Sequence, residues 1–192
     1  MSRILEKLYY AMALGAALAV VVIVWYHGYR VGHRDYWAPF FTFLHVLSGI
    51  TWIGLLYYFN LVQMPMMPKI SADLKPAVSK FIAPEALFWF RWSALSTVVT
   101  GLIVSYLNGY AHQAFMLVGP YRTIGTGMWL GLIMAFNVWF IIWPNQKKAL
   151  GIVKVDDGAK AKAARVAMLT SRANFVLSLP MLYCMVSYRL LG

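Results

Sequence analysis

Five long apolar runs constrain this chain more than any other feature of its sequence. They cover residues 8–26, 40–64, 87–107, 125–143 and 173–191. A transmembrane helix needs about 20 consecutive apolar residues, whereas barrel strands are shorter and alternate in polarity. Because lipid offers the backbone no hydrogen-bond partners, only helices and closed barrels span a membrane, and these runs do not fit barrel strands. The sequence therefore predicts an all-α fold, an integral membrane bundle of five transmembrane helices in a single membrane domain, 1–192.

The composition agrees with a membrane protein and excludes several other classes. The chain is 61% hydrophobic and 12% charged, against about half apolar and a quarter charged in soluble domains. A single cysteine, Cys184, excludes an internal disulfide and a c-type haem attached through C-x-x-C-H. All six acidic residues lie in or beside loops. This argues against a proton-coupled transporter, which needs carboxylates inside the membrane.

The positive charges predict how the helices cross the membrane. Eleven of the 17 Lys and Arg residues fall in loops on the N-terminal side, and four fall on the other side. The positive-inside rule then places the N-terminus in the cytoplasm and the C-terminus in the periplasm, in a multi-pass protein of the bacterial inner membrane. The net charge of +11 follows from this asymmetry and from attraction to membrane lipid, so no nucleic-acid partner is expected.

The longest connection, 144–171, becomes a basic cytoplasmic loop in this topology. It starts at Pro144, which is predicted to end the fourth helix because proline interrupts helical hydrogen bonding. The Ala/Lys run 159–164 is rich in helix formers and is predicted to extend the fifth helix into the cytoplasm. Small residues at four-residue spacing, Thr97, Gly101 and Ser105, form a predicted contact stripe on the third helix.

A histidine in the second apolar run is the clearest candidate for chemistry, because polar groups inside a bilayer are costly. His45 lies eight residues after Trp37, roughly 12 Å along the helix and in the outer half of the membrane. Its neighbours on the same face are Ser48, Gly49 and Trp52. Small residues leave room for a flat ring, and imidazole is a common axial ligand of haem iron. The alternative is a neutral histidine hydrogen-bonded to a neighbouring helix.

The other histidines, His27, His33 and His112, fall in the two outer loops. His112 or His27 is the candidate for a second axial ligand, if its loop folds inward. Solvated loop residues are the alternative, and His33 is assigned to that class. The three histidines also permit a copper site. That site ranks lower because no carboxylate or thiol joins them.

A second group of polar residues gathers toward the cytoplasmic half of the predicted bundle. It comprises Asn60, Arg91, Asn137, Arg172 and Asn174. Two arginines make the group net positive, so it suits haem propionates, a lipid phosphate or an anionic substrate. Arg91, Asn137 and Asn174 are the members predicted to bind a cofactor or an anionic substrate. The alternative is that the two arginines extend to the cytoplasmic lipid headgroups.

Four blocks of sequence resemble the membrane domain of the bacterial cytochrome-c-linked urate oxidase family. The blocks are 43–60 (FLHVLSGITWIGLLYYFN), 84–92 (PEALFWFRW), 136–148 (FNVWFIIWPNQKK) and 172–182 (RANFVLSLPML). They follow one another through spans two to five. The resemblance implies a membrane oxidase whose full-length members have more spans and carry a c-type cytochrome domain. This chain looks like the C-terminal half of that membrane domain, without the cytochrome domain.

The helix that carries His45, Trp52 and Gly54 is also similar to the histidine-bearing span of a membrane protoporphyrinogen oxidase family. That likeness implies haem b, with His45 as the iron ligand. The prediction is therefore a haem-b-binding inner-membrane protein in electron transfer, with a periplasmic cytochrome c or a larger membrane complex as partner. Self-association into a homo-oligomer is a further expectation, and no catalytic residue is assigned. The alternative is a cofactor-free structural or accessory subunit of a respiratory or oxidase complex.

Overall fold

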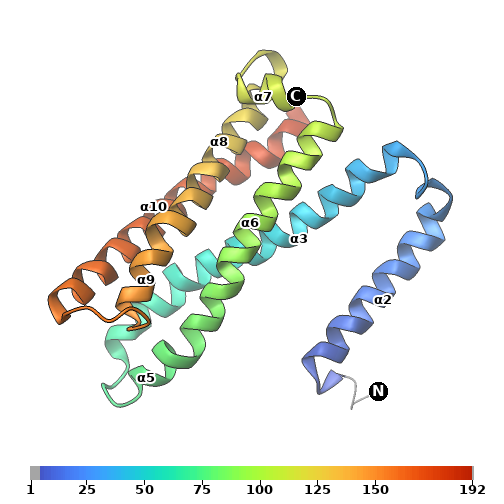
Figure 1. The fold of residues 1–192 in the computed structure, drawn as a ribbon. Coiled ribbons are helices and arrows are strands. Elements are labelled where there is room, and N and C mark those ends of the chain that lie inside the picture. Colours follow the sequence, from blue (N-terminus) through green and yellow to red (C-terminus); the bar gives the residue numbers. More distant parts are fainter. Residues whose placement is uncertain (1–4, 192) are drawn as a thin grey trace. The chain divides into compact units, whose positions relative to one another are not determined.

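The computed structural model describes residues 5–191, which contain helices and turns and no strand. The chain divides into two compact units, Met1–Phe40 and Phe41–Gly192. The first contains helix α2, Leu8–His27, none of whose residues is buried. The predicted all-α class is confirmed for the described part of the chain (Figure 1).

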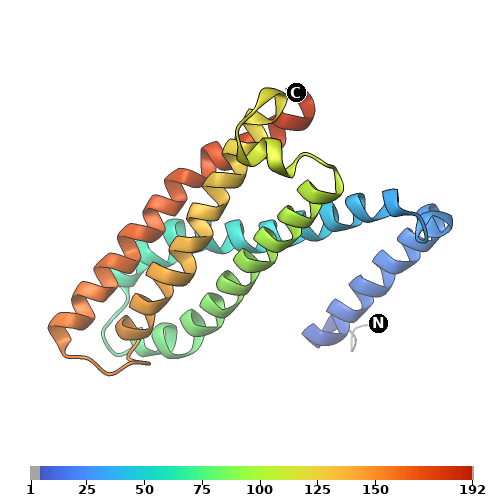
Figure 2. The same cartoon turned by 45° about the horizontal axis from the view of Figure 1, so that its top comes forward.

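Four long helices form most of the described part of the second unit. They are α3 (Trp37–Tyr57), which begins in the first unit, α6 (Ala83–Leu107), α8 (Arg122–Phe136) and α10 (Asp157–Leu191). Shorter helices lie between them: α4 (Met64–Met66), α5 (Lys75–Ala77), α7 (Ala111–Phe115) and α9 (Trp143–Ala149). Helices α8 and α9 pack along α10, and α7 packs against α8 (Figures 1 and 2).

Prolines explain three π-helical segments of the described chain. Each segment ends two residues before a proline: Tyr58–Gln63 before Pro65, Val78–Ile82 before Pro84, and Asn137–Ile142 before Pro144. Proline lacks an N–H and its ring clashes with the carbonyl four residues earlier. A π turn widens the helix locally, so the chain continues past the proline. The prediction that Pro144 ends the fourth helix is therefore wrong, because the helix continues through α9 to Ala149.

Four helical stretches of the described chain are long and apolar enough to cross a membrane. They are Leu8–Arg30, Arg34–Lys69, Lys75–Leu107 and Gly119–Ala149. These stretches contain the first four predicted spans. The fifth predicted span, 173–191, lies within α10, which is not among them. The fifth crossing and the sides of the two termini therefore stay predictions.

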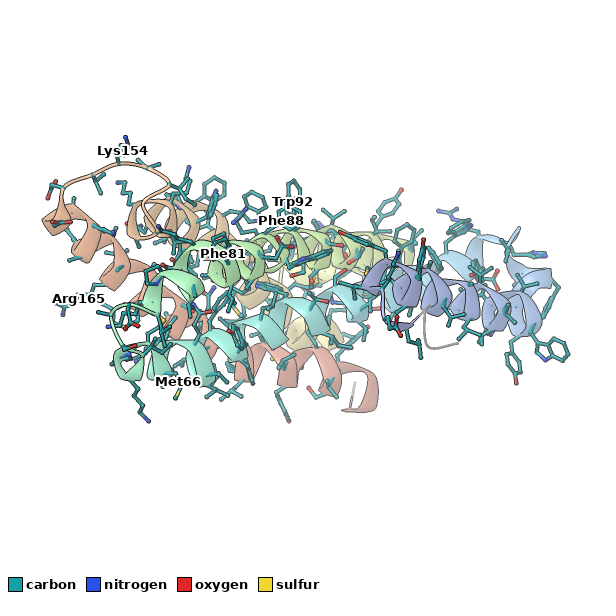
Figure 3. All side chains as sticks on the ribbon, turned by 90° about the horizontal axis from the view of Figure 1, so that it is seen from below. Met66, Phe81, Phe88, Trp92, Lys154 and Arg165 are labelled. Carbon is teal, nitrogen blue, oxygen red and sulfur yellow. The ribbon has the colours of Figure 1, made fainter. Side chains whose placement is uncertain are left out.

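Helix α10 settles the structure of the predicted loop 144–171. It begins at Asp157, so the Ala/Lys run 159–164 belongs to the same helix as residues 173–191, as predicted. Within residues 144–171, only the segment 150–156 between α9 and α10 is non-helical. In Figure 3, Lys154 labels this short connection and Arg165 labels α10.

The apolar core of the second unit gathers side chains from its long helices. Its largest buried members include Trp52, Leu56, Phe90, Met134 and Val138. On the opposite side of α6, Phe88 and Trp92 are 44% and 49% exposed and project outward (Figure 3). Apolar side chains that face outward are compatible with lipid contact, because lipid tails are as apolar as the core.

Glycines let α8 approach its neighbours closely. A Cβ at Gly125 would overlap the backbone carbonyl of Ala114 in α7, and one at Gly127 would stand 3.0 Å from Cβ of Cys184 in α10. Small residues at such contacts are how membrane helices pack without a hydrophobic driving force between them. The contacts fix α8 against both α7 and α10.

Candidate cofactor-binding cavity

A cavity of about 1000 Å³ lies among α3, α6, α8 and α10. This volume is at the upper end of the range of about 300–1,000 Å³ found for small-molecule sites. Most of the lining side chains are apolar, and His45 contributes an imidazole. Trp52 and Met181 belong both to this lining and to the apolar core, so the cavity borders the core directly.

The His45 ring is oriented by the backbone of α6. Its Nδ1 lies 2.8 Å from the carbonyl oxygen of Thr97 and 3.5 Å from Oγ1 of Thr100. Because a carbonyl only accepts hydrogen bonds, Nδ1 carries the proton and donates it to Thr97. In a neutral imidazole the lone pair then resides on Nε2. No hydrogen bond from Nε2 to another described residue is formed.

The helix crossing beside His45 is made of small residues. A Cβ at Gly101 would stand 2.9 Å from Cε1 of His45 and 3.0 Å from its Nδ1, so the ring lies directly on the backbone of α6. Oγ of Ser48 lies 2.9 Å from Oγ of Ser96 across the same crossing. The predicted contact stripe on the third helix is confirmed at Thr97 and Gly101, which both touch α3.

Polar groups mark the cavity lining away from His45. Trp52 is 1% exposed, and its Nε1 has no hydrogen-bond partner among the described residues. An unsatisfied buried donor costs about 1–3 kcal/mol, so an acceptor on a bound group would stabilise it. Three tyrosines, Tyr110, Tyr121 and Tyr188, cluster with ring centroids 5.6–6.1 Å apart and also line the cavity.

Among the described residues that line the cavity, His45 is the one histidine. His112 is exposed on α7, and His27 is exposed at the end of α2 in the first unit. Three methionines do line the cavity: Met128, Met181 and Met185. They are not predictable as ligands from the sequence, because single methionines on apolar helices carry no signal that separates ligands from packing residues.

The predicted polar group of the cytoplasmic half lies apart from His45. Nδ2 of Asn137 donates to Oδ1 of Asn174 at 2.8 Å, and Nδ2 of Asn174 donates to the carbonyl of Met134 at 2.9 Å. Arg91 stacks on the ring of Trp143. Arg91, Asn137 and Asn174 are absent from the described cavity lining.

Of the predicted cofactor-binding residues, His45, Gly49 and Trp52 come together at the cavity. Ser48 is at the helix crossing instead, where its hydroxyl donates to the carbonyl of Leu44. Within residues 5–191, no group of three or more His, Cys, Asp or Glu side chains could hold a metal ion. A metal ion at His45 would therefore find no set of three such ligands among these residues, whereas haem iron is already held by its macrocycle.

Residues 113–190 match the family model described as urate oxidase N-terminal. The matched segment contains α8, α9 and nearly all of α10, and it includes two of the four resembling blocks, 136–148 and 172–182. It covers less than half of the chain. No curated protein and no solved structure was found to match.

The match to the urate oxidase N-terminal family thus covers one wall of the cavity. Helices α8 and α10 contribute that wall, including Met128 and Met185. The opposite wall, with His45 on α3 and Gly101 on α6, lies outside the matched residues. The likeness to a protoporphyrinogen oxidase family has no counterpart in these comparisons.

Proposed function

We propose that the chain is a haem-b-binding membrane protein that takes part in electron transfer and is related to membrane urate oxidases. The observation that carries the proposal is the state of His45. Thr97 fixes the proton on Nδ1, which leaves the Nε2 lone pair for a ligand. Histidines that bind metals almost always donate their other N–H to such a partner.

The hydrogen bond to Thr97 would equally suit a histidine that only joins two helices. The cavity favours the ligand-binding interpretation, because about 1000 Å³ of mostly apolar space borders the same ring. Small-molecule sites are concave, mostly apolar and supplied with a few polar groups, and the space beside His45 has these properties.

The residues present fit haem b. His45 would hold the iron, and Gly101 and Thr97 would keep the imidazole in one orientation. The apolar lining would exclude water from the macrocycle. Trp52 Nε1 and the hydroxyl of Tyr121 could each donate a hydrogen bond to an oxygen of the bound group. When bound, haem supplies one-electron transfer at a potential set by its axial ligands and surroundings.

A methionine thioether would be a candidate for a second ligand of the iron. Met128, Met181 and Met185 line the cavity, and His/Met ligation occurs in haem proteins. A methionine ligand would raise the reduction potential relative to a second imidazole. His112 and His27 stay predictions for the same position, and the methionines are added to them as candidates.

The partners follow from the predicted topology and from the family match. His45 lies in the outer half of the membrane in that topology, so a periplasmic cytochrome c is the proposed electron acceptor. The match at residues 113–190 makes urate the first donor to test. Assembly with a second copy or within a larger membrane complex would supply further helices around the cavity.

A visible spectrum of the purified chain tests the proposal. The protein is expressed with a haem precursor, purified in mild detergent, and recorded oxidised and dithionite-reduced, with a pyridine haemochrome assay for stoichiometry. We expect b-type bands at about one haem per chain, as one axial histidine would bind. His45→Ala should lose the haem, whereas His33→Ala, an exposed loop residue, should retain it.

A colourless, monodisperse protein would contradict the proposal, as would His45→Ala with unchanged haem content and spectrum. Co-purification of a colourless chain with partner subunits would support the alternative, a cofactor-free accessory subunit. If the protein binds haem but does not oxidise urate, the proposed role in electron transfer stands and urate is excluded as the electron donor.

A further inference from the structure

Arg91 is a buried cation outside the cavity, and the proposed haem site does not use it. Its side chain is 9% exposed. The guanidinium carbon lies 3.4 Å from the ring centroid of Trp143, so the guanidinium stacks on the indole face. Nζ of Lys147 lies 5.6 Å from the centroid of the same ring. Two positive side chains from α6 and α9 therefore converge on one tryptophan.

Stacking on Trp143 leaves at least one hydrogen-bond donor of Arg91 buried without a partner. A guanidinium has five N–H donors in its plane, and stacking satisfies none of them. Nη1 of Arg91 is buried and has no hydrogen-bond partner among the described residues. No salt bridge from Arg91 to a carboxylate is formed in the described part of the chain. Glu85, the acidic residue nearest to Arg91 in the sequence, is exposed and accepts a hydrogen bond from Nε1 of Trp89.

The tryptophan alone does not balance the charge. A cation–π contact contributes about 0.5–2 kcal/mol, whereas burying an unpaired ion costs several kcal/mol. An anion that accepts the free N–H groups would close this gap. The guanidinium fork matches the paired oxygens of phosphate in geometry.

The position of this group favours a phosphate at the membrane surface. Helix α9 and the start of α6 lie at the same end of the second unit (Figures 1 and 2). The predicted topology places that end in the cytoplasm, where anionic lipids accumulate and where basic pockets between helices bind their headgroups. Tryptophan at this level is typical of the membrane interface.

We infer that Arg91, Trp143 and Lys147 form a binding site for a phosphate group, supplied by the headgroup of an anionic phospholipid. The headgroup phosphate accepts hydrogen bonds from Arg91 and is attracted by Lys147, while Trp143 holds the guanidinium plane. The site is separate from the haem cavity, because none of the three residues lines it.

Thermal unfolding in nanodiscs of two compositions tests this site. Nanodiscs of phosphatidylcholine alone are compared with nanodiscs that contain phosphatidylglycerol. We expect the wild-type Tm to rise by about 5 °C or more with phosphatidylglycerol, since a ligand that binds only the folded state stabilises it. Arg91→Gln and Lys147→Gln should each lose most of this increment. Lys148→Gln, an exposed neighbour on α9, should keep it.

Native mass spectrometry of the same variants gives a second readout. Wild type should retain phosphatidylglycerol with at least about tenfold higher affinity than Arg91→Gln, as expected for loss of a charged hydrogen-bond donor. Inorganic phosphate added to phosphatidylcholine nanodiscs separates the two sources. A Tm increment reproduced by free phosphate supports the phosphate site and assigns it to a soluble ion.

Several results would overturn the inference. One is a wild-type Tm that responds neither to phosphatidylglycerol nor to phosphate. Another is an increment equally present in Arg91→Gln and Lys147→Gln. An Arg91→Gln variant more stable than wild type in both nanodiscs would also overturn it, because an uncompensated buried charge is relieved when neutralised.

Discussion

Substitution of Gly101 by alanine tests how α6 holds the proposed iron ligand. The new Cβ would stand 2.9 Å from Cε1 of His45. Carbon atoms in good contact are about 3.5–4.0 Å apart, so the ring has to move by about 0.6 Å to reach the short end of that range. The Nδ1 to Thr97 oxygen distance is 2.8 Å. A shift of that size would weaken or break this hydrogen bond, whose normal range ends near 3.2 Å.

The expected cost can be stated as a change in haem affinity. An extra methyl group in a well-packed site typically costs about 1–3 kcal/mol. If the strain falls on His45, haem binding weakens by about 5- to 150-fold, since 1.4 kcal/mol corresponds to tenfold. Helicity should not suffer, because alanine is a better helix former than glycine.

Haem titration of the purified protein in detergent provides the assay, with the visible spectrum recorded at each point. Gly54→Ala is the matched control, because Gly54 also lines the cavity but has no atom within 4 Å of an added Cβ. We expect Gly54→Ala to bind haem like wild type. A Gly101→Ala protein with wild-type affinity and an unchanged spectrum would refute the assigned contact between the two helices.

Three further predictions concern packing, the asparagine pair and the second ligand. Gly125→Ala should lower stability by about 1–3 kcal/mol in thermal or denaturant unfolding, because its Cβ would overlap the backbone of Ala114; an unchanged Tm would contradict this contact. Asn174→Ala removes one buried and one partly buried hydrogen bond and should cost about 1–3 kcal/mol of stability. It should leave the haem content unchanged, so haem loss at unchanged stability would contradict the separation of Asn174 from the cavity. Single leucine substitutions at the three methionines of the cavity lining, Met128, Met181 and Met185, should identify one whose loss changes the haem from six-coordinate to five-coordinate. Electron paramagnetic resonance measures this change, and an unchanged spectrum in all three variants would exclude a thioether ligand.

The sequence was sufficient to locate helices and to select His45. Long apolar runs dictate helices in lipid whatever their neighbours, and four of the five predicted spans coincide with long apolar helices. His45 could be chosen because a lone imidazole in such a run is costly. Helix boundaries near prolines were less predictable, since the helix continues past Pro144 through a π turn that leaves no clear trace in composition.

The grouping of polar residues could not be read from depth along the helices alone. Arg91, Asn137 and Asn174 are predicted to form one group in the cytoplasmic half, yet Arg91 stacks on Trp143. Asn137 instead donates a hydrogen bond to Asn174, which donates to the carbonyl of Met134. Residues at one depth need not share a face, because a helix turns its side chains by about 100° per residue.

The amino-acid sequence alone is enough to predict that this chain is helical, is apolar enough for a membrane, and has one histidine within an apolar run. Those properties depend on local hydropathy and on each helix satisfying its own backbone. Only the tertiary structure decided that Thr97 and Gly101 hold the ring of His45 and that a cavity borders it. Thr97 and Gly101 both lie more than 50 positions after His45 in the sequence. Their meeting depends on where two helices cross, which small side chains and close backbone contacts determine.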